Sequence, residues 1–193
     1  MLAEAGWKDT DGDWILDKDG KTFEFTVLTN QGNDQRRMAC EMMQKRFKDV
    51  GIVMKIQMVE WSTFLREFID KKRFEAVVLA WQLPRDPDCF DIFHSSKTTQ
   101  GNFNFVSYRN QEVDQLLETG RRLFKEEKRA PVYHRIHEIL SEEEPYTFLY
   151  VPDALPIVHK RFKGIEPAPA GIGHNFIKWF VPKDEQRYKL TRG

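Results

Sequence analysis

Long apolar runs are missing from the sequence, and cysteine is scarce, with two among 193 residues. A helix that spans a bilayer needs roughly 20 consecutive apolar residues. No stretch approaches that length, so we expect no transmembrane helix. Cys40 and Cys89 lie far apart and form neither a CxxC pair nor a metal-binding spacing. One disulfide and two buried thiols both stay open, so cysteine does not identify the cellular compartment.

An excess of charge of either sign is also missing. The 30 Lys and Arg residues balance the 30 Asp and Glu residues, so no overall field attracts nucleic acid or an anionic membrane. The basic runs at 71–73 and 160–161 are short and far apart, and we interpret each as a solvated face. The sequence therefore predicts no nucleic-acid partner.

The motifs of common enzymes are missing as well. The sequence has no Gly-x-Ser-x-Gly elbow and no phosphate-binding loop. The spacing of Asp9, Asp11 and Asp13 imitates the start of an EF-hand loop. However, Trp14 stands where that loop needs Gly for its bend, and Gly20 stands where it needs a bidentate Glu. A structural hairpin is therefore favoured over a calcium site.

A second pattern that resembles a metal site consists of two histidines. His134 and His137 are one helical turn apart, but the Glu of a zinc-protease motif and a third ligand are both missing. We interpret them as surface residues. The sequence therefore predicts no catalytic residue, no bound metal and no cofactor.

The first half of the chain alternates strand and helix patterns. A half-buried strand is predicted at 21–29, a helix at 35–50 capped by Asn33 or Asp34, and a second strand at 52–59. A strand, helix and strand of these lengths predict a βαβ unit with parallel strands. The methionines of the helix, at positions 38, 42 and 43, are expected in the core.

A near-continuous apolar run at 74–81 predicts a central strand covered on both faces. The loop that follows, 83–88, holds two prolines and three charges. In open α/β sheets, ligands bind in the crevice outside the carboxyl ends of strands. This loop is therefore the best site candidate.

The other predicted elements are shorter or lie later in the chain. They are a strand at 14–16, a helix at 64–72 opened by Ser62 or Thr63, a short helix at 89–95, a polar and aromatic loop at 96–108, helices at 110–119 and 126–143, and strands at 148–151 and 154–159. The segment from Gly164 is rich in Pro and Gly and ends in an aromatic cluster.

The order of these elements and a set of local strings resemble family 5 of the bacterial extracellular solute-binding proteins, the oligopeptide, dipeptide and nickel class. The strings are those at 2–7, 9–13, 25–30, 51–52, 60–61, 80–81, 86–88, 92–96, 101–105, 110–114 and 133–139, followed by Pro145-Tyr146. Each string is weak alone, but the ordered set covers essentially the whole chain and is strong.

The resemblance implies an α/β fold, a lobe of the type II periplasmic-binding-protein kind with a mixed sheet and flanking helices. It assigns 1–163 to the second, C-terminal lobe of a two-lobed protein and 164–193 to a crossover toward the missing first lobe. It implies a substrate-binding component of an ABC transporter that binds oligopeptides or a related solute. The implied partners are that solute and a membrane permease, and the parent protein is expected to be a monomer.

No signal peptide is evident, because the first seven residues are too short and too acidic for one. Either the protein is cytosolic, or the chain is a fragment whose signal lies upstream. The resemblance favours the second interpretation. It implies a periplasmic parent protein, or one anchored as a lipoprotein at the outer face of the cytoplasmic membrane.

By resemblance, Trp81 and Gln82 line the cleft, where backbone groups pair with an extended peptide. The aspartate that receives the peptide ammonium in related binders would be three residues after the tryptophan, where this chain has Pro84. Asp86 is the candidate to replace it, since a buried ammonium needs a paired charge. The full predicted ligand-binding set is Trp81, Gln82, Leu83, Arg85, Asp86, Asp88 and Phe103.

Several alternatives stay open. Trp81 can instead be a core aromatic that ends a strand, and Asp86-Pro87-Asp88 a turn with a helix cap at Asp88. Because Pro84 puts recognition of a free amine in doubt, a sugar or a modified peptide is also a candidate ligand. A binding lobe, an enzyme and an interaction module remain the three classes of function, and the missing motifs make the enzyme the weakest.

Overall fold

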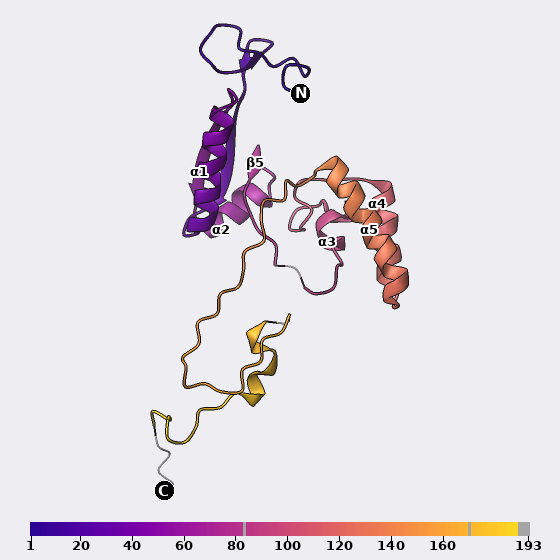
Figure 1. Cartoon of the computed structure of the whole chain (residues 1–193). Helices are drawn as coiled ribbons and strands as arrows, with labels where there is room; N and C mark the ends of the chain where they lie inside the picture. Colours follow the sequence, from indigo (N-terminus) through magenta and orange to yellow (C-terminus); the bar gives the residue numbers. More distant parts are fainter. Residues whose placement is uncertain (83, 170, 189–193) are drawn as a thin grey trace. The chain divides into compact units, whose positions relative to one another are not determined.

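The computed structural model describes residues 1–82, 84–169 and 171–188, so the predicted site residue Leu83 lies outside the described residues. The chain divides into two compact units, Met1–Tyr146 and Thr147–Gly193 (Figure 1). The assignment of 1–163 to a second lobe concerns a longer parent protein and stays a prediction. None of the helices in the described ranges is long and apolar enough to cross a membrane.

The first unit contains a three-stranded parallel sheet in the order β4-β3-β5. Strands β3 (Glu24–Asn30) and β4 (Val53–Val59) pair along their whole length, and helix α1 (Asp34–Lys48) connects them. The predicted parallel βαβ unit is therefore confirmed. A small separate ladder of β1 (Asp17–Lys18) and β2 (Lys21–Thr22) is antiparallel, and the segment predicted as a strand at 14–16 only precedes it.

Helix α1 begins as predicted, because the Asn33 side chain accepts a hydrogen bond of 2.9 Å from the Arg36 N–H. Its inner face buries Cys40 against Val27 and Met54. The expectation for the methionines is wrong in part, since Met38 and Met42 are exposed. Three positions on one helix at spacings of four and one cannot all face the same sheet, so only the third, Met43, packs against this core.

The apolar run at 74–81 does not form a central strand. Only β5 (Ala76–Val77) pairs, with β3 alone, so it lies at the edge of the sheet and β3 is central. The predictions at 148–151 and 154–159 are also wrong, since within the described ranges that stretch joins no sheet. An apolar run supplies the side chains of a strand, but hydrogen bonds to a neighbouring strand are needed to make one.

The helix predicted at 64–72 begins earlier and is wound more loosely than expected. A single turn, α2 (Trp61–Thr63), continues into a π-helix, η1 (Phe64–Ile69). Its cap is Glu60, whose carboxylate accepts hydrogen bonds from the N–H groups of Ser62 (2.8 Å) and Thr63 (2.9 Å). These two bonds lower the pKa of Glu60 to about 2.

The remainder of the first unit is helical. Two short turns, α3 (Phe90–Phe93) and η2 (Ser95–Lys97), precede the long helices α4 (Gln111–Arg122) and α5 (Glu126–Glu143), which pack side by side (Figure 1). Their buried side chains form what we call the helical cluster: Cys89, Ile92, Phe93, Val113, Leu117, Tyr133, Ile136, Ile139 and Leu140. The sheet cluster consists of Leu28, Val59, Phe64, Ile69 and Phe105.

The second unit is held by a few polar contacts. The backbones of Lys163 and Phe180 form an antiparallel bridge. Beside it, the 3₁₀ helix η3 (Ile172–Lys178) carries Asn175, whose amide donates to the Gly164 carbonyl (2.8 Å) and accepts from the Trp179 indole (2.9 Å). With one asparagine satisfying both groups, this short segment keeps a defined conformation without a large apolar core.

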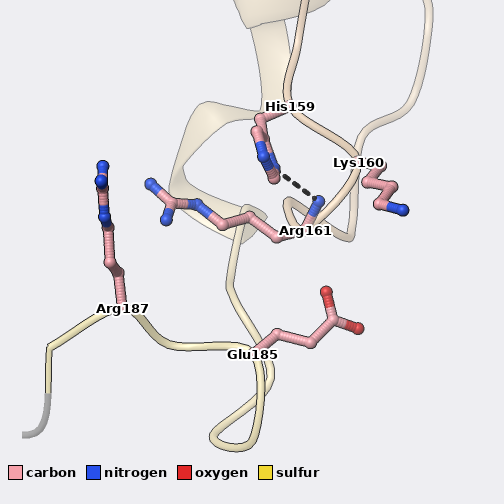
Figure 2. A pocket seen from close by; sticks show the side chains of 5 residues that line it. All are labelled: His159, Lys160, Arg161, Glu185 and Arg187. Carbon is pink, nitrogen blue, oxygen red and sulfur yellow. Dashed lines mark hydrogen bonds between the residues drawn. The ribbon is translucent and has the colours of Figure 1, made fainter.

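A cavity of about 550 Å³ in this unit is lined by His159, Lys160, Arg161, Glu185 and Arg187. Figure 2 shows the guanidinium group of Arg161 beside that of Arg187, while Lys160 and Glu185 point away from them. The backbone N–H of Arg161 donates a hydrogen bond to His159 Nδ1 at 3.3 Å. Of the predicted solvated run at 160–161, Lys160 is exposed, whereas Arg161 is only partly exposed and its Nε is buried without a hydrogen-bond partner among the described residues.

Gly120 determines how closely α4 approaches α5. A Cβ atom at this position would lie 2.9 Å from the Tyr133 ring and hydroxyl. We predict that Gly120→Ala destabilises the protein by about 1–3 kcal/mol, because overpacking outweighs the gain in helix propensity of roughly 1 kcal/mol. Chemical denaturation of both proteins measures the difference. Gly173→Ala is the control, since nothing lies within 4 Å of a Cβ there, and a Gly120→Ala variant as stable as wild type would contradict the prediction.

Candidate functional site

Trp81 follows β5 and lies where the two clusters of the first unit meet. Its ring stacks on Phe105 with centroids 5.8 Å apart and meets the edge of Phe103 at 5.4 Å. It packs against both the helical cluster and the sheet cluster. The interpretation of Trp81 as a core aromatic at the end of a strand therefore has direct structural support, and the ring is only partly buried.

Tyr146 packs against the same two clusters, close to Trp81. Burial raises the pKa of Tyr146 to about 12, and the Trp81 side chain acts in the opposite direction. This tyrosine therefore stays protonated across the physiological range. It belongs to the aromatic packing beneath the site and offers no charge to a ligand.

Phe103 forms the exposed part of this aromatic group, with 55% of its surface accessible. Its position depends on Asn104, which is completely buried. The Asn104 amide nitrogen donates to the carbonyls of Phe93 (3.3 Å), His94 (3.1 Å) and Tyr108 (2.9 Å), and its oxygen accepts from the Tyr108 N–H (2.9 Å). The loop that presents Phe103 is therefore fixed from within.

The aspartates of the predicted site are paired with arginines. The two Asp86 oxygens accept hydrogen bonds from Arg129 of α5, at 2.8 and 2.9 Å. Asp88 accepts one of 2.8 Å from Arg121 Nε of α4. The bidentate geometry of the first pair is the strong form of an arginine–carboxylate contact. The hydrogen bonds from Arg129 also hold the pKa of Asp86 below its ordinary value.

The pairing changes what Asp86 can offer a ligand. A peptide ammonium would have to compete with Arg129, which also donates to the Gly120 carbonyl (3.1 Å) and the Tyr133 hydroxyl (3.2 Å). Asp88 instead supports the cap interpretation, because its Oδ1 accepts from the Phe90 N–H at 3.1 Å where α3 begins. Gln82 and Arg85 are exposed or partly exposed, and Arg85 makes no hydrogen bond or ion pair with the described residues.

The arrangement of the predicted residues divides them into two groups. Trp81 and Phe103 touch one another although 22 positions separate them in the sequence. Asp86 accepts a hydrogen bond from Arg129 of α5, and Asp88 accepts one from Arg121 of α4. Sequence reasoning missed Asn104, Arg121 and Arg129. The only signal for Asn104 was its place among aromatic residues in a polar loop. Arg121 and Arg129 had no signal, because the sequence of a surface helix does not show which residues its charged side chains contact.

The residues whose spacing resembles that of metal sites, Asp9, Asp11, Asp13, His134 and His137, are all exposed. The Asp9 carboxylate accepts hydrogen bonds from the N–H groups of Gly12 (2.7 Å) and Trp14 (3.0 Å), as in a tight turn. Carboxylate oxygens of Asp9, Asp11 and Asp17 lie within 4.8 Å of one another and are largely exposed. His134 and His137 are exposed on α5.

The two cysteines are free thiols in separate cores, Cys40 beneath α1 and Cys89 in the helical cluster. Burial raises the pKa of the Cys89 thiol to about 11. Of the two possibilities that the sequence leaves open, the structure has the pair of buried thiols.

Comparison with known proteins gives a consistent picture. Residues 1–104 match the family model described as bacterial extracellular solute-binding proteins, family 5 Middle. The oligopeptide-binding protein AppA of Bacillus subtilis is 41% identical over 184 residues, which are 95% of this chain and 34% of that protein. The chain thus spans about a third of the length of this relative.

Solved structures agree with the sequence comparison. AppA of Bacillus subtilis in complex with a nonapeptide superimposes with a TM-score of 0.76, covering 94% of this chain and 36% of that one. NikZ of Campylobacter jejuni in complex with Ni(L-His) has a TM-score of 0.71 at 26% identity and covers 92% and 37%. These neighbours are solute-binding proteins of the type II periplasmic-binding-protein class, which confirms the predicted α/β fold class.

The pairing of Asp86 should make stability depend on pH in a definite direction. Its pKa is lowered from 3.8 in the folded protein, so its contribution is complete above the unfolded pKa and is lost as pH falls through the folded one. We predict that Asp86→Asn lowers the urea midpoint at pH 6, and that the deficit shrinks as the pH falls below 3.8. Asp153→Asn, which removes an exposed carboxylate without an ion pair among the described residues, is the control. A deficit that is constant with pH would contradict the prediction.

Proposed function

The chain belongs to family 5 of the bacterial extracellular solute-binding proteins, and from this premise we propose that it is part of the solute receptor of an ABC importer. In this proposal it binds oligopeptides or a related solute in a cleft between two lobes. The family consists of solute-binding proteins and not of enzymes. The relative AppA, at 41% identity, is an oligopeptide-binding protein whose structure holds a nonapeptide.

The observation that carries the proposal is the exposed aromatic surface of Phe103 beside Trp81, which lies four residues after the end of β5. Aromatic rings supply contact area with little loss of side-chain entropy. Asn104 and the stacked Phe105 hold this surface in place before any ligand arrives. A preformed surface outside a carboxyl strand end is what ligand sites of α/β sheets require.

The remaining parts of the proposal concern the parent protein. Residues 1–163 would supply most of its second lobe, and 164–193 would cross toward the first. The parent would work in the periplasm or at the outer face of the cytoplasmic membrane, with or without a lipid anchor. It would be a monomer that delivers its solute to a membrane permease. The extracellular family and the partial coverage of AppA support this organisation.

A solute without a free amine is the second candidate. Pro84 occupies the position of the expected ammonium anchor, and Asp86 is paired with Arg129. The relatives extend beyond peptide binders, since NikZ of Campylobacter jejuni holds Ni(L-His). This candidate is favoured if acetylation of the peptide amine leaves binding unchanged.

We predict that the full-length parent gains thermal stability with a library of short peptides, whereas this chain gains little. Ligand that binds only the native state stabilises it by about 2.7 kcal/mol at 100 times Kd, and a third of the protein offers only part of the contacts. Differential scanning fluorimetry of both proteins measures the shifts. Equal shifts for the chain and the parent would show that one lobe suffices, and hydrolysis of the peptides would indicate an enzyme.

A substitution at Phe103 distinguishes a side chain that contacts the ligand from one that only packs inside the protein. We predict that Phe103→Ala in the parent weakens peptide binding about tenfold, or about 1.4 kcal/mol. The melting temperature without ligand should change little, because the side chain is half exposed. Phe124→Ala is the matched control, since Phe124 is 98% exposed. Calorimetric titration measures both affinities, and equal affinities for the two variants would remove Phe103 from the site.

A further inference from the structure

Residues 147–158, at the start of the second unit, combine apolar composition with exposure. Asp153 is the single charged residue among them, and Val151 and Ile157 are 93% and 100% exposed. The large exposed apolar side chains of the segment are Phe148, Leu149, Tyr150, Val151, Leu155 and Ile157. A continuous apolar surface of this kind marks a place where another part of a protein packs.

The backbone of 149–158 also lacks a partner among the described residues. The stretch 147–159 forms no helix, strand or turn, and Figure 1 shows it as a plain tube. No backbone group of 149–158 forms a hydrogen bond with a described residue. Pro152 and Pro156 favour an extended chain, because proline fixes its own φ angle and disfavours the helical region for the residue before it. The segment therefore has the composition and backbone of a strand without a neighbouring strand.

The two prolines restrict which edge of this segment can pair. In a strand, the N–H and C=O of one residue point to one neighbouring strand, and those of the next residue point to the opposite side. Positions 152 and 156 are both even, so the even-numbered edge lacks two donors. From 149 to 157 the odd-numbered edge keeps every donor. Prolines occur in sheets on edge strands, where their side of the strand faces away from the ladder.

The likeness to AppA of Bacillus subtilis indicates where a neighbour for the odd-numbered edge lies. The sequence match covers 95% of this chain but 34% of that protein, and the superposition covers 94% and 36%. The counterpart of 147–158 thus belongs to a protein of which about two thirds lies outside the matched part. That additional chain can provide the sheet that the described residues do not offer to this edge.

We propose that residues 147–158 form an edge strand in the parent protein, and that their odd-numbered edge pairs with a sheet built by the part of the parent outside this chain. This inference rests on the proposed function, in which the chain is one part of a two-lobed receptor. It moves the start of the crossover from 164 to 147, the boundary between the two compact units. The chain then contributes a strand to the first lobe as well as most of the second.

Hydrogen exchange of the full-length parent, resolved to single residues by mass spectrometry, tests the pairing. We expect the odd-numbered amides from 149 to 157 to exchange at least about 100-fold more slowly in the parent than in this chain, because each must first open a ladder hydrogen bond. The amides of Tyr150 and Ala154, on the other edge, should change much less. Fast exchange of the odd-numbered amides in the parent would overturn the inference, and equal protection of both edges would overturn the assignment of the edge.

A matched pair of proline substitutions gives a second result. Asp153→Pro removes a donor from the odd-numbered edge, and Ala154→Pro removes one from the even-numbered edge. In the parent, Asp153→Pro should lower the melting temperature by several degrees relative to Asp153→Ala, whereas Ala154→Pro should change it little. In this chain, where the segment is unpaired, neither substitution should lower it. Equal losses for the two prolines in the parent would contradict pairing through one edge.

A second copy of this chain is the competing occupant, because an unpaired strand edge can also pair with itself. Protection that rises with the concentration of this chain and is missing from the parent would assign the edge to self-association and overturn the inference. Titration of the same parent with peptides tests the proposed function separately. A parent that binds peptides with unprotected odd-numbered amides overturns the inference alone, whereas a parent with protected amides that binds no solute overturns the proposed function and keeps the pairing.

Discussion

The bidentate contact between Asp86 and Arg129 links the loop after β5, where the proposed ligand site lies, to helix α5. The loop after β5 leaves the edge of a small sheet, where only two residues of the strand are paired. Such an edge cannot fix the direction of the loop that leaves it. The loop is instead held by α4 and α5. These two helices pack closely because Gly120 has no side chain and the Tyr133 ring fills the space beside it. The position of the site is therefore set by helix packing and carried to the loop by charge-assisted hydrogen bonds.

Trp81 also links two parts of the first unit, through apolar contacts in place of charged ones. It packs against both clusters, so removing it would open a gap between the sheet and the helices of the first unit. A ring with this packing cannot move to suit different ligands. Phe103, which touches Trp81 from an exposed loop, is the group that can make new contacts. Of the two touching rings, Trp81 is partly buried and joins the clusters, whereas Phe103 is the more exposed.

Much of this arrangement can be predicted from sequence patterns, and the exceptions have physical reasons. The helices predicted at 110–119 and 126–143 appear as Gln111–Arg122 and Glu126–Glu143 because their buried positions recur at the helical period. The strands predicted after 147 did not form, since a strand depends on a distant partner that composition does not encode. The pairing of Asp86 with Arg129 was not foreseen for the same reason, because 43 positions separate the two residues.

The loop shows why residue type alone does not determine what Asp86 contacts. A carboxylate in a site loop suggests an ammonium ligand, but its effect on a ligand depends on the charge left after internal pairing. With both acids satisfied, the loop keeps only the guanidinium of Arg85, which the sequence treats as one charge among three. A ligand ammonium would therefore have to displace the Arg129 guanidinium before it could pair with Asp86.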